Sequence, residues 1–309
     1  MSKEISIKEF LSSRTNTPIV DVRSPKEYQL AHIPGAINIP LFNDAERAMV
    51  GTTYKHEGRE KAITQGLELV GPKMAEFVAE GKRILQEHQA VYITMHCWRG
   101  GMRSKSMATL FNFAGIPTLT ITGGYKVYRN AVQQSFANPL HLIVLGGKTG
   151  SAKTAILQAL QQQGEQIIDL EKLANHKGSA FGQLGEDPQP SSEYFENLLF
   201  EKIQQLDSTK RIWIEDESHL IGKVFIPETF WEQMRNAQVI YCDFPIEERI
   251  NYLVTTYGNF DHEGVIESVK RITKKLGGQD AKAALEAYEA SNLKKATEIV
   301  LVYYDKTYN

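Results

Sequence analysis

Short apolar runs alternate with amphipathic segments along most of the chain. In the first half, apolar runs at residues 18–22, 91–95 and 118–121 each precede a segment whose apolar positions have helical spacing. In the second half, similar runs occupy residues 140–145, 211–214 and 239–242. Strands that alternate with helices are typical of a parallel sheet covered by helices on both faces, so the pattern predicts an α/β fold.

One break in this pattern divides the chain. The helical pattern of the first half ends at Ala137-Asn138-Pro139, and a new apolar strand starts at Leu140. Each side of the break is long enough to form a hydrophobic core of its own. We therefore predict two α/β domains, comprising residues 1–137 and 138–309.

A polar segment at residues 42–70 interrupts the alternation and has no strong periodicity. Long irregular connections frequently carry function. We expect a loop here that acts as a substrate lid, and a solvated surface excursion is the alternative.

A reactive cysteine is predicted between the apolar run at residues 91–95 and the amphipathic segment at residues 107–114. The sequence His96-Cys97-Trp98-Arg99-Gly100-Gly101-Met102-Arg103-Ser104 predicts a strand end, a tight loop and a helix start. Loop N–H groups, the positive helix end and Arg103 would favour the thiolate of Cys97 and hold an anion above it. We predict Cys97 and Arg103 as catalytic residues. The predicted oxyanion loop comprises Trp98, Arg99, Gly100, Gly101 and Met102.

A phosphate-binding loop is predicted after the strand at residues 140–145. Gly147, Lys153 and Thr154 match the Walker A pattern, with Ala152 in place of its second glycine. We expect this alanine to be tolerated if it has helical dihedral angles. Backbone N–H groups at a helix start cradle a diphosphate, and the lysine neutralises it. The predicted diphosphate site comprises Gly147, Lys148, Thr149, Gly150, Ser151, Ala152, Lys153 and Thr154.

Three acids follow the apolar strand at residues 211–214, where Glu215, Asp216 and Glu217 precede Ser218. In P-loop proteins the acid that assists Mg²⁺ lies at the end of such a strand. We predict all three as candidate acids and a Mg²⁺ site at Thr154 and Asp216. Surface acids at a strand end are the alternative.

Composition narrows the choice of partners and location. The formal net charge is −2, so a nucleic acid would have to be held by a local basic patch. The two cysteines form no disulfide framework, which favours a reducing compartment. Residues 1–15 lack the features of a signal peptide, and no apolar run approaches bilayer length. We therefore expect a cytoplasmic protein without membrane contact.

The first domain contains Asp21-Val22-Arg23, Glu27-Tyr28, His32-Ile33-Pro34-Gly35-Ala36-Ile37-Asn38-Ile39-Pro40 and the Cys97 loop. This combination resembles the rhodanese family of sulfur-carrying α/β domains. The resemblance implies a rhodanese-like parallel-sheet domain, here followed by a P-loop NTPase-like α/β domain.

The spacing within the Cys97 loop departs from the rhodanese pattern. Single-domain rhodaneses usually place the arginine five residues after the cysteine, whereas Arg103 is six residues after Cys97, as in cysteine phosphatases of related fold. A longer loop can hold a larger tetrahedral oxyanion. An alternative function is therefore a cysteine-dependent phosphatase or sulfurtransferase fused to a nucleotide-binding switch domain.

Further motifs extend a resemblance over the whole chain. They are the Cys97 loop, residues 170–179, Glu215-Asp216-Glu217-Ser218 and Tyr303-Tyr304-Asp305, in a rhodanese domain fused to a P-loop domain. The chain thereby resembles the tRNA 2-selenouridine synthase family. The resemblance implies a transferase that converts wobble 2-thiouridine in tRNA to 2-selenouridine through S-geranyl-2-thiouridine. Its implied substrates are geranyl diphosphate and selenophosphate, the latter a candidate for delivery by its own synthase, and it implies no prosthetic group.

Contacts with tRNA are expected on two segments. His176, Lys177 and Ser179 lie in the segment that carries the family resemblance. Residues 263–276 predict a helix with a basic face that can bind phosphates, although a solvated helix face is the alternative. The candidate residues on this helix are Lys270, Arg271, Lys274 and Lys275.

Overall fold

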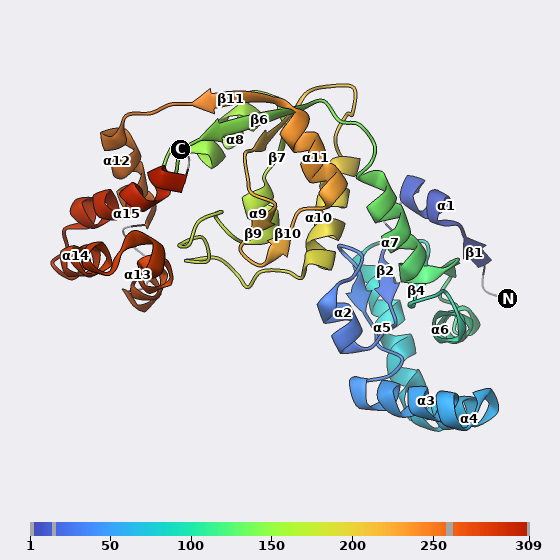
Figure 1. Ribbon diagram of the computed structural model, residues 1–309. Helices are drawn as coiled ribbons and strands as arrows, with labels where there is room; N and C mark the ends of the chain where they lie inside the picture. The colour runs from blue at the N-terminus through green and yellow to red at the C-terminus, as the bar shows by residue number, and fades with distance from the viewer. Residues whose placement is uncertain (1–2, 14–16, 258–261, 308–309) are drawn as a thin grey trace. The chain divides into compact units, whose positions relative to one another are not determined.

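The chain forms two compact units, Met1–Ser135 and Phe136–Asn309. The structure is a computed structural model that describes residues 3–13, 17–257 and 262–307, so parts of the segment examined for a signal peptide lie outside the described residues. Each unit contains a parallel sheet (Figure 1). The predicted α/β fold is therefore confirmed.

The first unit contains a five-stranded parallel sheet of order β1-β5-β4-β2-β3. The three-residue strand β1 precedes the first helix and was not expected from the sequence. The strands are β1 (Lys3–Ile5), β2 (Ile19–Asp21), β3 (Ile37–Asn38), β4 (Ile93–His96) and β5 (Thr118–Ile121). The helices that connect them are α1 (Ile7–Ser12), α2 (Pro25–Leu30), α5 (Met74–Glu87), α6 (Met102–Phe113) and α7 (Gly124–Ser135).

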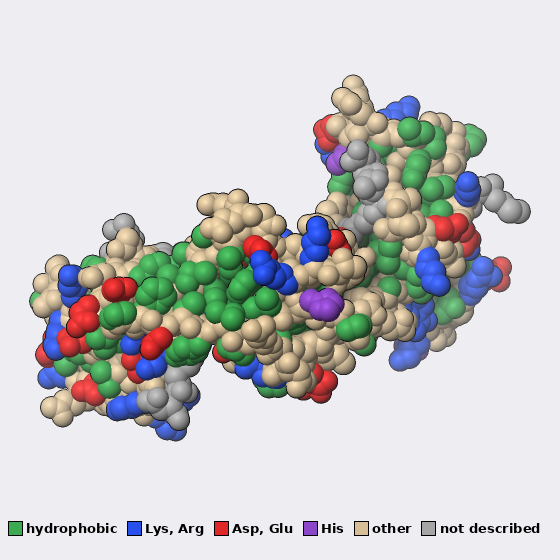
Figure 2. All heavy atoms as spheres, turned by 90° about the horizontal axis from the view of Figure 1, so that it is seen from above, with side chains coloured by type: hydrophobic (Ala, Val, Ile, Leu, Met, Phe, Trp, Pro, Cys, Tyr) green, Lys and Arg blue, Asp and Glu red, His purple; other side chains and the backbone are tan. Residues whose placement is uncertain are grey.

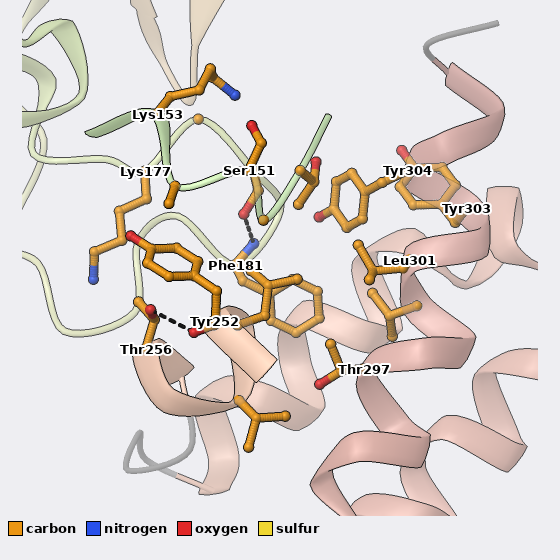
Figure 3. Close-up of a pocket in the computed structure, with 18 of the residues that line it drawn as sticks. Ser151, Lys153, Lys177, Phe181, Tyr252, Thr256, Thr297, Leu301, Tyr303 and Tyr304 are labelled. Atoms are coloured by element: carbon orange, nitrogen blue, oxygen red, sulfur yellow. Dashed lines mark hydrogen bonds between the residues drawn. The ribbon is translucent and has the colours of Figure 1, made fainter. Parts of the chain in front are cut away.

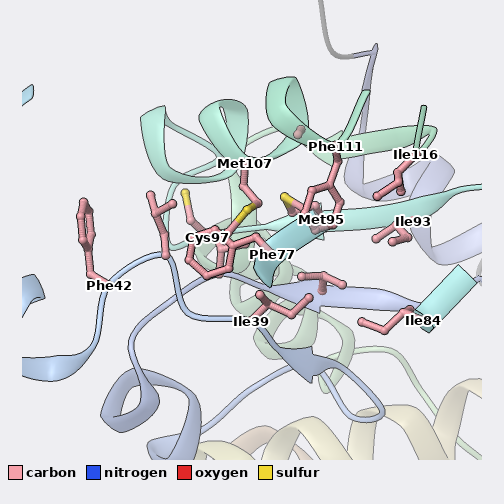
Figure 4. Close-up of a cluster of buried hydrophobic side chains, with 14 residues drawn as sticks. Ile39, Phe42, Phe77, Ile84, Ile93, Met95, Cys97, Met107, Phe111 and Ile116 are labelled. Carbon is pink, nitrogen blue, oxygen red and sulfur yellow. The ribbon is translucent and has the colours of Figure 1, made fainter. Parts of the chain in front are cut away.

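The core of the first unit lies between the sheet and helices α5 and α6 (Figure 4). Met95 on β4 packs in one cluster with Phe77 of α5 and with Met107 and Phe111 of α6. Burying apolar side chains of this size stabilises a fold by about 1.5–3 kcal/mol each. Cys97 belongs to the same cluster, so a packed strand end positions its side chain.

The polar segment at residues 42–70 is helical, so the expectation of a loop is wrong. It forms α3 (Asp44–His56) and α4 (Arg59–Val70), followed by a short 3₁₀ turn. Asn43 and Glu46 form a capping box that starts α3. Lys73 Nζ lies 2.6 Å from Glu46 Oε2 across the segment. The two helices expose many of their side chains, which is why the apolar pattern did not reveal them.

The second unit contains a four-stranded parallel sheet of order β11-β6-β8-β7. Its strands are β6 (Leu142–Gly147), β7 (Gln166–Ile168), β8 (Ile212–Glu215) and β11 (Gln238–Cys242). The accompanying elements are α8 (Lys153–Gln162), α9 (Leu170–Ala174), α10 (Ser192–Gln204), α11 (Glu228–Asn236) and the antiparallel pair β9 (Leu220–Ile221) and β10 (Val224–Phe225). The phosphate loop follows an inner strand of the sheet, at the edge where α/β proteins commonly bind ligands.

Four helices complete the second unit and lie together in Figure 1. They are α12 (Ile246–Tyr257), α13 (His262–Leu276), α14 (Gly278–Glu289) and α15 (Leu293–Thr307). Val269, Ile272 and Leu276 of α13 pack with Ala281 and Ala284 of α14 in a small core of their own.

An exposed apolar surface lies on β11, at one edge of the second sheet. Val239 and Tyr241 are each 52% exposed, and Figure 2 shows hydrophobic side chains gathered on the face that carries this strand. Within the described ranges, no helix combines the length and apolar character that a membrane span requires.

Candidate functional site

The Cys97 loop runs from β4 to α6, and close backbone contacts with the start of α7 fix its shape. The N–H groups of Tyr125 and Lys126 donate to the carbonyl oxygens of Cys97 and Trp98, both at 2.9 Å. Gly124 has a φ of +59°, and a Cβ atom there would collide with the Cys97 carbonyl oxygen. A glycine is therefore required at position 124 to hold this loop.

Backbone N–H groups of the Cys97 loop are available to an anion. Those of residues 98–101 donate to no other residue that the structure describes. Helix α6 begins at Met102, so its positive end adjoins the same loop. The Cys97 thiol is buried, and its Sγ atom accepts a hydrogen bond from Ser104 Oγ at 3.3 Å. This arrangement can hold an oxyanion beside a cysteine, as the sequence predicts.

Arg103 has a carboxylate partner that sequence reasoning missed. Its Nη1 atom lies 2.6 Å and its Nη2 atom 3.3 Å from the two oxygens of Glu27. Burial alone would raise the pKa of Glu27, but the Arg103 hydrogen bonds and charge lower it below its usual value. Glu27 entered the sequence analysis only through the rhodanese resemblance, and the structure shows that it also caps α2, so no local feature marked it as the partner of Arg103.

The remaining residues of the Cys97 loop lie toward solvent. Trp98 is 37% exposed, and its ring centroid lies 5.7 Å from that of Tyr125. Arg99 and Met102 are also exposed. These three side chains are therefore accessible to a substrate that approaches the loop.

A buried charge network lies next to the Cys97 loop. The Arg23 guanidinium donates two hydrogen bonds to the Asp21 carboxylate. It also lies 3.9 Å from the Tyr125 ring centroid. His96 Nδ1 is 3.8 Å from Asp21 Oδ1. Burial lowers the pKa of His96, so its ring is neutral at pH 7. The network fixes the end of β4, and Cys97 follows directly.

The phosphate loop contains several hydrogen-bond donors that an anion could use. Lys153 Nζ donates to the Gly147 carbonyl oxygen at 3.1 Å. N–H groups at residues 148–150 and 152–154 donate to no described residue. Ser151 Oγ is buried and also lacks a partner among the described residues. The loop therefore offers several donors to a diphosphate.

Ala152 does not have the helical dihedral angles that the sequence analysis expected. Its φ is +55° and its ψ is +31°, which is the left-handed conformation. Glycine adopts this conformation readily, whereas an alanine in it carries backbone strain.

The acids nearest to Thr154 are Glu171 and Glu217. Thr154 Oγ1 donates to Glu171 Oε2 at 2.8 Å. A Cβ atom on Gly178 would lie within 2.8 Å of carboxylate oxygens of both acids, so they share one small space. Burial and the neighbouring Glu171 charge raise the pKa of Glu217 to about 8, and burial also raises that of Glu171.

The other two acids predicted after β8 have different surroundings. Asp216 forms an ion pair with Arg235. Glu215 is fully buried, and one of its oxygens accepts from the Leu170 N–H at 3.2 Å while the other has no described partner. Glu171 was missed, although it lies in the segment at residues 170–179 that was already singled out. Within the described residues, no group of three or more His, Cys, Asp or Glu is arranged to hold a metal ion.

A single cavity of about 460 Å³ connects the phosphate loop to the four C-terminal helices. The phosphate loop, Lys177 and Glu217 line its polar part. In Figure 3, Phe181 lies between Ser151 and the α15 residues Thr297 and Leu301. Helices α12–α15 contribute mostly apolar and aromatic side chains. The cavity therefore suits a ligand with an anionic head and an apolar body.

Two family models match the chain, one in each unit. The family model described as tRNA 2-selenouridine synthase AAA domain matches residues 140–309, and the one described as rhodanese-like domain matches residues 6–131. The chain belongs to the tRNA 2-selenouridine synthase family. The resemblance predicted from its motifs is thereby confirmed, as is the rhodanese-like character of the first sheet.

Curated relatives named tRNA 2-selenouridine synthase match most of the chain. One from Nitrosomonas europaea is 37% identical over 78% of this chain and 64% of its own length. One from a Sulfurovum species is 36% identical over 89% of this chain and 79% of its own. One from Shewanella denitrificans is 33% identical over 97% of this chain and 89% of its own length. The chain thus spans less than two thirds of the length of the Nitrosomonas europaea relative.

Of the three residues predicted to contact tRNA in the segment 170–179, two line the cavity and one does not. Lys177 and Ser179 are in its wall, and Lys177 Nζ lies 2.9 Å from Glu186 Oε1. His176 is buried, which lowers its pKa. The basic residues of α13 are exposed opposite its buried apolar face, so a basic surface is available to a polyanion. They are Lys270, Arg271, Lys274 and Lys275.

Arg249 of α12 contacts two other elements of the second unit. Its guanidinium is buried and pairs with Asp305 of α15 at 2.9 and 2.6 Å. The same group donates to the Thr149 carbonyl oxygen at 3.0 Å. Arg249 therefore connects the phosphate loop to the last helix, a contact that local spacing cannot reveal.

Proposed function

We propose that this chain is an enzyme that converts wobble 2-thiouridine in tRNA to 2-selenouridine. In the first half-reaction, a geranyl group would move from geranyl diphosphate to the sulfur, and diphosphate would leave. In the second, selenium from selenophosphate would replace the geranylthio group. Membership of the tRNA 2-selenouridine synthase family supports the overall reaction. A tRNA-modifying enzyme works where tRNA is, so the expected cytoplasmic location is part of this proposal.

The cavity of the second unit is the observation that carries the proposal for geranyl diphosphate. Unpartnered N–H groups and Lys153 would bind the diphosphate, and the apolar wall from α12–α15 would bury the prenyl chain. Each buried carbon contributes about 0.8 kcal/mol to such binding. A nucleotide would instead place a polar sugar and base against this wall, which costs free energy unless they find hydrogen-bond partners.

A Mg²⁺ ion fits the polar part of this cavity. Glu171 and Glu217 would hold it together with Thr154. Asp216, which the sequence predicts as a ligand, lines the same cavity and pairs with Arg235. Mg²⁺ prefers oxygen ligands and commonly binds through one or two carboxylates plus phosphate oxygens. When bound, it would stabilise the negative charge that develops on the leaving diphosphate.

The Cys97 loop is proposed to deliver selenium. Selenophosphate would present its oxyanion to the N–H groups of residues 98–101. The Cys97 thiolate would attack the phosphorus atom, so that an S–P bond forms, the P–Se bond breaks and selenide leaves. Selenide would then displace geranylthiolate from the base, and water would release phosphate from Cys97. Arg103 would contribute its charge from the position in which Glu27 holds it. Exposed basic residues on α13 would bind the phosphates of tRNA.

Mass spectrometry of nucleosides tests the proposal. A 2-thiouridine tRNA is incubated with geranyl diphosphate, Mg²⁺, selenophosphate and either the unsubstituted chain, Cys97→Ala or, as the matched control, Cys242→Ala. We expect 2-selenouridine from the unsubstituted chain and from the control, and accumulation of geranylthiouridine with Cys97→Ala.

Two results would contradict the proposal. An unchanged tRNA with the unsubstituted chain would favour the cysteine phosphatase or switch function, which hydrolysis of an aryl phosphate would then test. Loss of geranylation in Cys97→Ala, with selenation of a pre-geranylated tRNA intact, would overturn the division of labour between the two units.

A further inference from the structure

Two alanines interrupt the larger side chains in the apolar wall of the cavity. Ala284 of α14 is 1% exposed and Ala296 of α15 is 9% exposed, and both line the cavity. Their neighbours in the wall include Val269 of α13 and Val300 of α15. The side-chain volume of the wall is therefore smallest at these two alanines.

The N-terminal half of α15, which carries Ala296, lies away from the phosphate loop, whereas the C-terminal end of this helix meets the loop through Asp305 and Arg249 (Figure 3). In Figure 3, Thr297 and Leu301 of α15 project into the cavity on the side away from Lys153. A prenyl diphosphate anchored at the phosphate loop would extend its chain toward this wall. The distance between the loop and the wall then limits the number of carbons that fit.

We propose that Ala284 and Ala296 determine which prenyl chain length the cavity accepts. The inference rests on the proposed binding of a prenyl diphosphate. Protein interiors are packed densely, so an added side-chain carbon at the wall excludes ligand volume instead of being absorbed. Replacing either alanine by leucine adds three carbons to the wall and should exclude the end of a ten-carbon chain while leaving room for a five-carbon chain.

Calorimetric titration of the full chain with four probes tests this proposal. The probes are inorganic diphosphate, dimethylallyl diphosphate, geranyl diphosphate and farnesyl diphosphate, with five, ten and fifteen carbons in the last three. For Ala284→Leu and Ala296→Leu, we expect the affinity for geranyl diphosphate relative to dimethylallyl diphosphate to fall by about tenfold or more. The affinity for inorganic diphosphate should not change, because the phosphate loop is not altered.

A variant that enlarges the cavity keeps the inference testable even if the leucine variants fail to fold. Val300→Ala removes two carbons from the wall and should raise the affinity for farnesyl relative to geranyl diphosphate by about tenfold. Ala283→Leu is the matched control, because Ala283 precedes Ala284 on α14 and does not line the cavity. Its affinity ratios should equal those of the unsubstituted chain.

The outcomes separate this inference from the proposed function. If the unsubstituted chain binds no prenyl diphosphate more tightly than inorganic diphosphate, the proposed function fails. If it does, but the ratios are unchanged in folded Ala284→Leu and Ala296→Leu, the two alanines do not determine chain length. If neither leucine variant folds, an unchanged ratio in Val300→Ala is enough to overturn the inference.

Discussion

Ala152 shows how a single residue can carry strain at a binding loop. Its left-handed backbone costs an alanine roughly 1–2 kcal/mol relative to glycine, and the Walker A pattern has glycine at this position. Strain of this kind persists where the surrounding structure determines the conformation, as the phosphate loop does between β6 and α8.

Replacing Ala152 by glycine should therefore stabilise the second unit. Glycine removes the strain, but its more flexible unfolded chain costs about 0.5–1 kcal/mol more to order. We therefore expect the free energy of unfolding to rise by up to about 1 kcal/mol. Urea unfolding of the full chain measures this, with Trp213 and Trp231 fluorescence as the probe in a Trp98→Phe background.

The control for this substitution is Ala159→Gly, on the exposed side of α8. In the interior of a helix, glycine should lower the free energy of unfolding by about 1 kcal/mol, because its flexible backbone costs more entropy to order than that of alanine. A destabilisation of similar size in both variants would show that the backbone of Ala152 is not strained.

At the residue scale, the sequence predicts candidate residues where the chemistry is local. Cys97, Lys153 and Thr154 lie in short loops whose glycines and flanking strands mark them. Glu27 and Asp305 were missed as partners because they contact Arg103 and Arg249 across 76 and 56 positions of sequence. No local pattern encodes such pairs, since they depend on how separate elements pack.

At the scale of elements, the sequence predicts a strand or helix well only when one of its faces is buried. The strands of both sheets have this contrast and were found, whereas α3 and α4 expose most of their side chains and were mistaken for a loop. Their helical character depends on caps and contacts such as Lys73 with Glu46, which add to stability without creating an apolar period.

The Arg249–Asp305 pair joins two helices that line the cavity, and its removal should be costly. Asp305→Asn leaves the buried guanidinium without its anion, and we expect a loss of about 3 kcal/mol in the free energy of unfolding of the second unit. The double variant Arg249→Met with Asp305→Leu should recover most of this loss, because apolar groups of similar volume replace both charges.

Urea unfolding of the single and double variants checks this prediction as a double-mutant cycle. Arg271→Met is the matched control, because its pair with Glu267 lies on the exposed side of α13 and should contribute less than about 1 kcal/mol. Equal losses for Asp305→Asn and Arg271→Met would show that the buried pair does not hold α15.

At the scale of the whole molecule, each unit has its own sheet, its own core and its own loop at a strand end. The N–H groups beside Cys97 belong to the first unit, and those beside Lys153 belong to the second. In the proposed division of labour, each half-reaction would use the residues of one unit. Geranylated tRNA would be a covalent product that survives dissociation, and phosphate contacts to tRNA are reversible at moderate salt.

Two inactive variants should consequently complement each other when they are mixed. Lys153→Ala should lack geranylation, and Cys97→Ala should lack selenation, so neither alone makes 2-selenouridine from 2-thiouridine. We expect the mixture to make it, because tRNA released by Cys97→Ala can bind Lys153→Ala. Nucleoside mass spectrometry gives the readout. A mixture of Cys97→Ala with the double variant Cys97→Ala, Lys153→Ala is the control and should stay inactive.

A mixture of Lys153→Ala and Cys97→Ala that makes no 2-selenouridine would also be informative, provided that each variant performs its remaining half-reaction on a supplied substrate. Both chemical sites would then be intact, and only the passage of tRNA between separate chains would be blocked. That result would contradict free exchange of the geranylated intermediate and would require its transfer between the two units of one chain before release. Higher salt weakens phosphate contacts and should restore exchange if slow tRNA release is the cause.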